Sequence, residues 1–118
     1  MAWRSTLGVT DTLPEAIQKT GRPSIGGPIV TAGGLTFIGA TDDQRFRAFD
    51  SRTGAELWTV KLDASAHATP MTFMGADGKQ YVAIVYGPGG GSLWPLVYGE
   101  LFKQQNRGGG MMVFGLAD

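Results

Sequence analysis

The 118-residue chain has no cysteine, a single histidine and no excess of charge, because ten basic residues balance ten acidic ones. Without cysteine there is no disulfide, thiolate nucleophile or cysteine-based zinc site, although this leaves the cellular compartment open. Neither sign of charge forms a block that could follow a phosphate backbone, so we expect no nucleic-acid partner. No run approaches the roughly 18 apolar residues of a membrane helix, and residues 1–8 lack the pattern of a signal peptide.

Glycine and proline are plentiful, with 19 and 6 residues, which suits short strands joined by tight turns. Residues 1–27 are polar and rich in turn residues, and we interpret them as an irregular lead-in. After them, short β-prone runs alternate with Gly or Asp turns, which predicts one full blade of four antiparallel strands within residues 28–62. The predicted strands are 29–31, 35–38, 46–49 and 57–60.

The same pattern starts again about 40 residues later. Residues 69–74 and 81–85 predict a second hairpin, 86–110 a long loop, and 111–116 a last strand, which together make a partial blade over 69–118. Four-stranded sheets at this spacing are typical of β-propellers, so the predicted fold class is all-β, with about one and a half to two antiparallel four-stranded blades. A propeller needs at least four blades, so we expect the remaining propeller blades to be partners of this chain.

One motif is specific. Residues 48–58 read Ala-Phe-Asp-Ser-Arg-Thr-Gly-Ala-Glu-Leu-Trp and fit Ala-x-Asp-x-x-Thr-Gly-x-x-x-Trp at every fixed position. Asp50 can cap the turn, Thr53 can bond the backbone, Gly54 takes the unusual φ, and Trp58 fills the gap between neighbouring blades. The motif resembles the tryptophan-docking motif of quinoprotein dehydrogenases, where its role is structural.

The flanking sequence carries the resemblance further. Residues 26–41, 68–72 and 78–82 are similar to the C-terminal end of pyrroloquinoline-quinone (PQQ) glucose and quinate dehydrogenases, and the similarity runs over about residues 3–85. It implies an eight-bladed propeller that holds PQQ and calcium near its axis, oxidises a sugar or alcohol, and passes electrons to ubiquinone. It also implies a periplasmic location, with any export signal or inner-membrane anchor upstream of this chain.

The resemblance points to two cofactor-binding residues, Asp43 and His67. In the membrane glucose dehydrogenases an Asp follows an Ala-Thr-x step and contacts the cofactor region, and here residues 40–42 lead to Asp43. The alternative is an ordinary acidic turn, in which Asp42 is more solvated than Asp43. His67 stands where relatives often have Gln and would face the funnel at the blade entrance; the alternative is a structural histidine. We assign no general base and no metal ligand within this chain.

The chain departs from the family after Val85, because the glycine-rich stretch that follows lacks the histidine of the membrane glucose dehydrogenases. Glucose specificity is therefore not expected from the resemblance. Residues 113–118 are again similar to the family's closing residues, so residues 86–110 read as an insertion or variant loop.

Three functions remain open from the sequence. The leading hypothesis is a piece of a PQQ-dependent dehydrogenase, which we expect to be inactive as an isolated fragment. The rival is a non-catalytic β-propeller repeat protein that acts as a scaffold or interaction module. The third is a truncated remnant with no function of its own.

Overall fold

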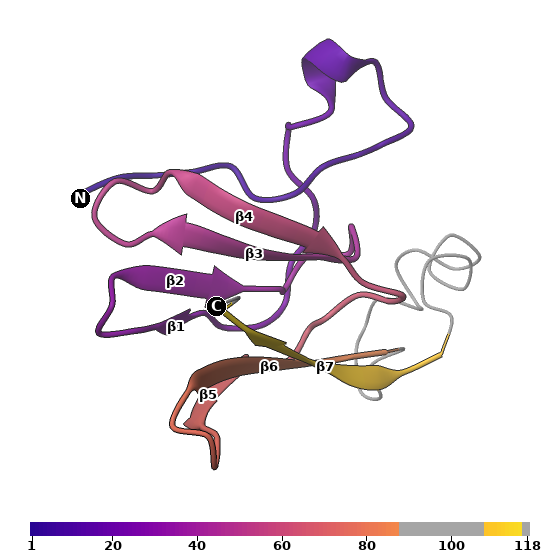
Figure 1. The fold of residues 1–118 in the computed structure, drawn as a ribbon. Helices are drawn as coiled ribbons and strands as arrows, with labels where there is room; N and C mark the ends of the chain where they lie inside the picture. The colour runs from indigo at the N-terminus through magenta and orange to yellow at the C-terminus, as the bar shows by residue number, and fades with distance from the viewer. Residues whose placement is uncertain (88–107, 117–118) are drawn as a thin grey trace.

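The computed structural model describes residues 1–87 and 108–116, which form two antiparallel sheets (Figure 1). The first sheet has strand order β1-β2-β3-β4 and the second has order β5-β6-β7, and every pairing joins neighbours in the chain. The predicted all-β class is confirmed. The strands are β1 Ile29–Val30, β2 Leu35–Ile38, β3 Arg45–Asp50, β4 Glu56–Lys61, β5 Met71–Met74, β6 Gln80–Tyr86 and β7 Gly110–Gly115.

The hairpin turns lie where glycine was expected to allow them. Gly34 has φ +88° in the turn before β2, and Gly78 has φ +76° in the turn before β6. Left-handed backbone costs glycine little, because it has no Cβ to clash with the preceding carbonyl. The two turns therefore set the register in which Ile29 pairs with Phe37 and Met74 pairs with Gln80.

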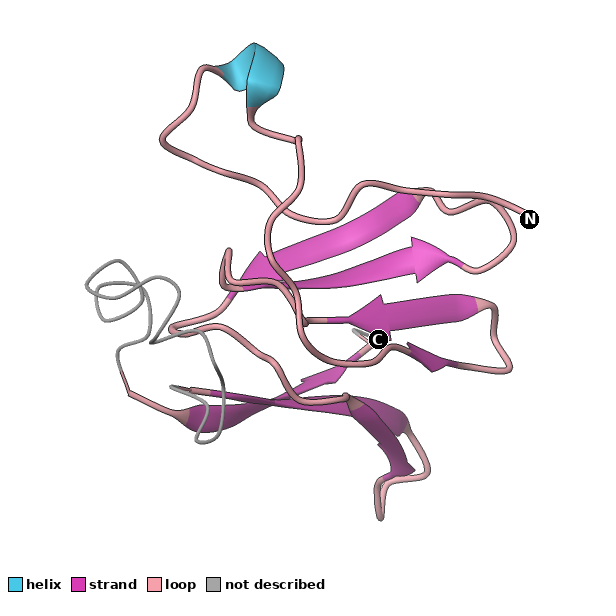
Figure 2. Cartoon of the chain, turned by 180° about the vertical axis from the view of Figure 1, so that it is seen from behind, coloured by secondary structure: helices cyan, strands magenta, loops and turns pink. Residues whose placement is uncertain are grey.

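The two sheets lie one against the other in both views of the ribbon (Figures 1 and 2), and side chains from both form one buried apolar cluster. Phe46 of β3 is fully buried at the centre of this cluster and is stacked on Phe37, with ring centroids 5.9 Å apart. The second sheet contributes Val82 and Ile84 to the same buried cluster. Alternate residues of each strand thus point into one core, which is the pattern expected of sheets that bury a single face.

The N-terminal segment covers the opposite face of the first sheet. Trp3 stacks on Phe49 of β3, and its indole N–H donates to the carbonyl of Ser51 at 2.8 Å. Within the segment, a 3-10 helix η1 (Glu15–Ile17) forms in a loop that projects away from the sheets (Figure 1). These contacts attach the N-terminal segment to the first sheet. The division of the chain into an irregular lead-in and blades stays a prediction.

The outer face of the second sheet is apolar and exposed among the residues that the structure describes. Its side chains are Met71, Phe73, Val85, Met111 and Val113. In soluble monomeric proteins, an apolar patch of this kind is normally covered by other parts of the structure. The predicted loop 86–110 lies mostly outside the described residues, and its ends differ from expectation, because Tyr86 closes β6 and Gly110 opens β7.

No helix in the described ranges is long and apolar enough to cross a membrane.

Replacing Phe46 by Ala should disrupt the layer between the sheets. Phe46 is fully buried, so we expect the free energy of unfolding to fall by about 3–5 kcal/mol, which urea denaturation followed by tryptophan fluorescence would measure. Val30→Ala is the matched control, because Val30 is 68% exposed and its loss should stay within about 0.5 kcal/mol. Equal losses for the two variants would contradict a core centred on Phe46.

Candidate functional site

The turn between β3 and β4 has the geometry that the motif predicted. Asp50 Oδ1 accepts the backbone N–H groups of Arg52 at 2.8 Å and Thr53 at 3.0 Å, and these bonds, that of Thr53 first, lower the pKa of Asp50. Gly54 has φ +75°, and a Cβ on it would lie 2.5 Å from the ring of Trp3. Glycine is therefore required here both by conformation and by space.

Trp58 lies between the two sheets. Its ring meets Phe46 edge-on at 5.8 Å and Phe114 of the second sheet edge-on at 5.0 Å. A bulge in β4 makes this placement, since Ala48 pairs with Trp58 while Phe49 pairs with Glu56. Trp58 consequently contacts both sheets, as the motif predicted for a side chain between neighbouring blades.

The turn from β2 to β3 is strained and tightly held. Ala40 has φ +65° and Gln44 has φ +62°, a left-handed conformation that costs a non-glycine residue on the order of 1–2 kcal/mol. Three neighbouring segments bond this turn: Ile25 N–H donates to the Ala40 carbonyl at 2.9 Å, Ala40 N–H donates to Ala66, and Leu62 N–H donates to Gln44. The surrounding structure therefore imposes the conformation.

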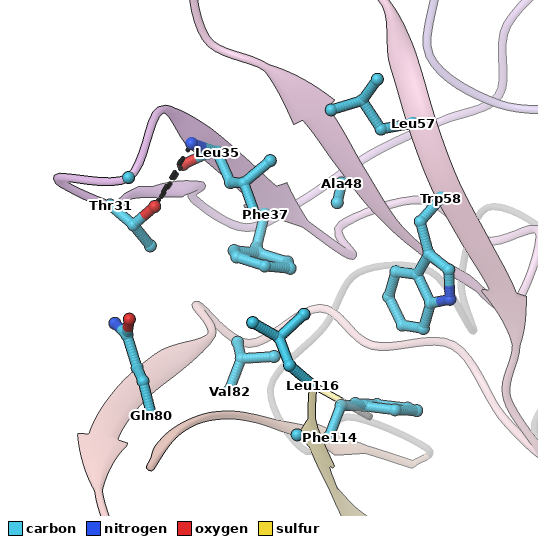
Figure 3. A pocket seen from close by; sticks show the side chains of 12 residues that line it. Thr31, Leu35, Phe37, Ala48, Leu57, Trp58, Gln80, Val82, Phe114 and Leu116 are labelled. Atoms are coloured by element: carbon cyan, nitrogen blue, oxygen red, sulfur yellow. Dashed lines mark hydrogen bonds between the residues drawn. The ribbon is translucent and has the colours of Figure 1, made fainter. Parts of the chain in front are cut away.

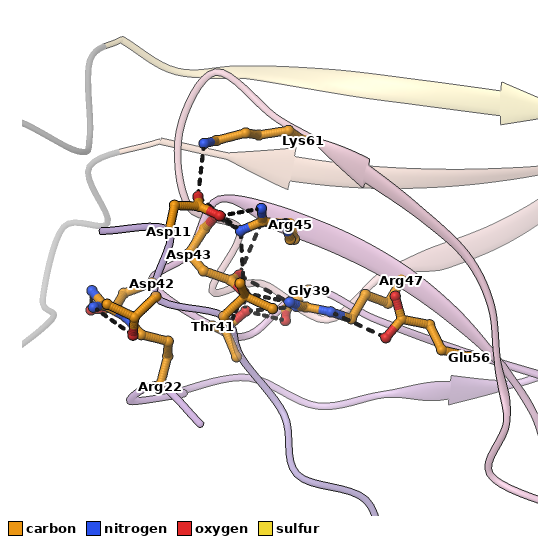
Figure 4. Close-up of polar contacts among 12 residues, drawn as sticks. Asp11, Arg22, Gly39, Thr41, Asp42, Asp43, Arg45, Arg47, Glu56 and Lys61 are labelled. Carbon is orange, nitrogen blue, oxygen red and sulfur yellow. Dashed lines mark hydrogen bonds and ion pairs between the residues drawn. The ribbon is translucent and has the colours of Figure 1, made fainter. Parts of the chain in front are cut away.

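Asp43 lies in this turn with its carboxylate buried, and both carboxylate oxygens accept hydrogen bonds from several donors (Figure 4). Its Oδ1 accepts the hydroxyl of Thr41 at 2.5 Å and the backbone N–H of Arg45 at 3.2 Å. Its Oδ2 accepts the backbone N–H of Val9 at 2.9 Å. Both oxygens also accept from the guanidinium of Arg47, with which Asp43 forms a buried ion pair.

Two opposing effects set the pKa of Asp43. Burial raises the pKa of the carboxyl, but the hydrogen bonds from Arg47 and Thr41 and the charge of Arg47 outweigh burial, so the pKa lies below its ordinary value. Asp43 is therefore a carboxylate at neutral pH. Its lone pairs are directed at partners within this chain.

Asp42, expected to be the more solvated of the two aspartates, is buried as well. Asp42 is only 3% exposed, and its two oxygens accept from Nε and Nη2 of Arg22 at 2.7 and 2.8 Å (Figure 4). This bidentate ion pair replaces the water that an acidic turn would otherwise hold. Both aspartates thus lie buried in the turn between β2 and β3, each paired with an arginine.

His67 lies beside the same turn. Its Nδ1 is 2.9 Å from the carbonyl oxygen of Ala40. A Cβ on Gly26 would lie 2.8 Å from the His67 carbonyl oxygen, so the two backbones approach closely here. The structure thus brings Asp43 and His67 to one turn, while their predicted roles in cofactor binding stay predictions.

The cations of this site, Arg22, Arg45 and Arg47, were not predicted from the sequence. Arg47 is 2% exposed and its Nε lies 3.9 Å from Oε2 of Glu56, while Arg45 pairs with Asp11 at 2.7 Å on the surface. The only available signal was the alternation in β3, where Arg47 sits between Phe46 and Ala48 and must point to the other face. A buried arginine on that face requires a carboxylate partner.

The described residues contain no group of three or more acidic or histidine side chains that could hold a metal ion. The buried carboxylates of Asp42 and Asp43 are already bonded to arginines. The described part of the chain therefore does not by itself provide a fitted site for calcium.

A separate apolar cleft of about 550 Å³ opens between the two sheets, and Asp43 is not among the residues that line it (Figure 3). Its walls come from β2, β3 and β4 on one side and from β6 and β7 on the other, and they include Leu35, Phe37, Trp58, Val82, Phe114 and Leu116. Trp58 is 37% exposed because it borders this cleft.

Comparison with known proteins gives consistent matches. Residues 1–82 match the sequence model of the PQQ "Glucose/ethanol/alcohol dehydrogenase, beta-propeller domain". The chain is 44% identical over 92 residues to "Quinoprotein glucose dehydrogenase A" of Acinetobacter calcoaceticus, a match that covers 74% of this chain and 11% of that protein. It is 44% identical over 94 residues to "Quinate/shikimate dehydrogenase (quinone)" of Acinetobacter baylyi, covering 74% of this chain and 12% of that protein.

A solved structure agrees in fold. A "Europium-containing methanol dehydrogenase" matches with a TM-score of 0.67 and 37% identity, covering 85% of this chain and 20% of that one. The chain therefore spans 11–12% of the length of the two curated relatives it matches.

Replacing Asp43 by Asn should destabilise the chain in a pH-dependent way. The pKa of Asp43 is lower in the folded state, so its carboxylate stabilises the fold above the unfolded value of 3.8 and loses this effect as the pH falls through the folded pKa. We expect Asp43→Asn to lower the free energy of unfolding by about 3 kcal/mol at pH 7. The difference in this free energy between the variant and the unchanged chain should narrow below about pH 4. Urea denaturation between pH 3 and 7 would measure it.

Asp11→Asn is the matched control, because Asp11 pairs with Arg45 and Lys61 on the surface and should matter by less than about 1 kcal/mol. If Asp43→Asn lowered the free energy of unfolding equally at pH 3 and pH 7, the ion-pair explanation would be contradicted.

Proposed function

Because the chain belongs to the PQQ glucose/ethanol/alcohol dehydrogenase β-propeller family, we propose that it is part of a dehydrogenase that oxidises a sugar or alcohol. The observation that carries this proposal is the family match over residues 1–82. The named relatives act on glucose, on quinate or shikimate, and on methanol, which all carry a hydroxyl group. Bound PQQ would accept the electrons when such a hydroxyl group is oxidised.

Within that enzyme, the proposed role of this chain is to supply two neighbouring sheets and a fixed turn at one end of them. Asp43 and His67 both bond the turn that starts at Ala40, one through its own carboxylate network and the other through the Ala40 carbonyl. The side chain of Asp43 has its acceptor positions filled. Its proposed contribution to the cofactor region is therefore to position this turn.

Calcium is the metal that we propose for the complete enzyme, bound by residues outside the described ones. One relative of solved structure is a europium-containing methanol dehydrogenase, so an assay has to include both calcium and a lanthanide. Ubiquinone is the proposed electron acceptor, and the word quinone in the name of the quinate relative supports that class. We also propose a periplasmic location for the enzyme, with any inner-membrane anchor upstream of this chain.

The scaffold alternative has one observation in its favour. Every buried carboxylate described here is paired with an arginine, which is an arrangement that stabilises structure. We therefore propose that the isolated 118-residue chain has no dehydrogenase activity, and that activity requires the rest of a propeller.

Exchanging the matching segment of the Acinetobacter calcoaceticus glucose dehydrogenase for this chain would test the function. Because the two segments are 44% identical over 92 residues, we expect the chimera to fold and to retain PQQ-dependent oxidation of glucose or of a simple alcohol. The measurement is dye-linked turnover after loading with PQQ and either Ca²⁺ or La³⁺. A folded chimera that binds PQQ but oxidises no sugar or alcohol would contradict the proposal.

Asp43→Ala in the same chimera should lower the rate at least tenfold, since it releases the turn beside His67. Asp11→Asn is again the control and should leave the rate within twofold, because Asp11 lies in a surface ion pair. Equal rates for all three chimeras would show that the turn plays no part in the reaction.

A further inference from the structure

The turn between β5 and β6 carries an aspartate followed by a glycine, Asp77 and Gly78, and both are exposed. Two backbone hydrogen bonds close this turn: Gly75 N–H donates to the Lys79 carbonyl at 2.8 Å, and Gly78 N–H donates to the Gly75 carbonyl at 3.0 Å. Gly78 has φ +76°, and a Cβ on it would meet no atom within 4 Å. The space beside the main chain of Gly78 is therefore open.

An aspartate that precedes glycine can be modified by its own main chain. The amide nitrogen of the glycine attacks the carboxyl carbon of the aspartate, a C–N bond forms, and the carboxyl O–H leaves with the amide proton as water. The product is a succinimide ring, and glycine favours its formation because no side chain hinders the nitrogen. Water then opens the ring at either carbonyl and gives aspartate or isoaspartate. No reactant other than water takes part.

In the folded chain, both carboxylate oxygens of Asp77 are held by donors. Tyr81 O–H donates to Oδ2 at 2.5 Å, and the Lys79 backbone N–H donates to Oδ1 at 3.0 Å. These bonds, that of Tyr81 first, lower the pKa of Asp77 and so favour its ionised form. The ionised carboxylate does not release an oxygen as water, so the two donors oppose ring closure.

The ring of Tyr81 is itself held in place. It stacks on Phe73 of β5, with ring centroids 5.6 Å apart and an angle of 21° between the planes. A Cβ on Gly75 would lie 2.6 Å from the Tyr81 ring, and one on Gly115 would lie 2.7 Å from it. Glycine at these two positions makes room for the ring, which keeps its hydroxyl directed at Asp77.

From the exposed turn and the hydroxyl that holds its carboxylate, we propose that Asp77 is a site of isoaspartate formation whose rate is controlled by Tyr81. Isomerisation lengthens the main chain of the turn by one carbon, so the two backbone bonds that close the turn cannot both re-form. The register between β6 and β5, a four-residue edge strand, is then lost at the turn. The inference rests on this hairpin alone and is independent of PQQ and of substrate.

Incubation in water enriched in the heavy oxygen isotope would test the proposal, because opening of the succinimide adds one heavy oxygen to the residue. The tryptic peptide 62–79 contains Asp77, and tandem mass spectrometry locates the label within it. In neutral buffer, Tyr81→Phe should label Asp77 about threefold faster than the unchanged chain, or more, because the variant lacks one hydrogen bond to a charged group. In guanidinium chloride, which removes the turn, the two chains should react equally.

Tyr86→Phe is the matched control. Tyr86 lies in the same strand, but its hydroxyl faces Asp63, at 3.5 Å, so the labelling of Asp77 should stay as in the unchanged chain. Asp50 reports on folding, because its carboxylate accepts backbone N–H groups in the first sheet and its labelling would rise with general unfolding.

Three results would overturn the proposal. Equal labelling of Asp77 in Tyr81→Phe and in the unchanged chain would remove control by Tyr81. An equal rise at Asp50 and Asp77 would assign the effect to unfolding of the chain. Absence of label at Asp77 in guanidinium chloride would show that the site does not react. None of these results affects the dehydrogenase proposal, which the chimera tests through turnover.

Discussion

The buried carboxylate of Asp43 is the constraint on which one end of this molecule depends. It joins the N-terminal segment through Val9, the turn through Thr41, and strand β3 through Arg47. A charge removed from water must be fully paired, because an unpaired one costs several kcal/mol. These three parts of the chain therefore cannot move independently, and the left-handed residues Ala40 and Gln44 are held in place by the same contacts.

Close backbone approaches support the same end of the structure. A Cβ on Gly39 would lie 2.7 Å from the carbonyl oxygen of Ala66, and one on Gly26 would lie 2.8 Å from that of His67. Only glycine permits such contacts without displacing backbone. Hydrogen bonds on one side and close backbone contact on the other thus fix the turn, which explains why the left-handed conformations of Ala40 and Gln44 persist between β2 and β3.

The strands were predictable because their signals are local. Alternation within β3 and glycine at the hairpin turns specify pairing between neighbours, and the Asp50 turn follows from five consecutive residues. The polar site was not predictable in the same way. Arg22 pairs with Asp42 across 20 positions, from a segment that shows no periodic pattern, so the sequence offered nothing to indicate that Asp42 is buried. Asp43 was selected through resemblance, whereas its partner Arg47 required knowledge of the sheet face.

The filled state of these carboxylates limits what they can do in a larger enzyme. A group that already accepts from several donors gains little from a further ligand, because each new bond has to replace an existing one in a buried setting. Contact with a cofactor from this end is therefore better served by the backbone of the 40–44 turn than by the carboxylate of Asp43. In the proposed enzyme, the reacting groups would then come from residues outside those described, and this turn would supply a rigid wall.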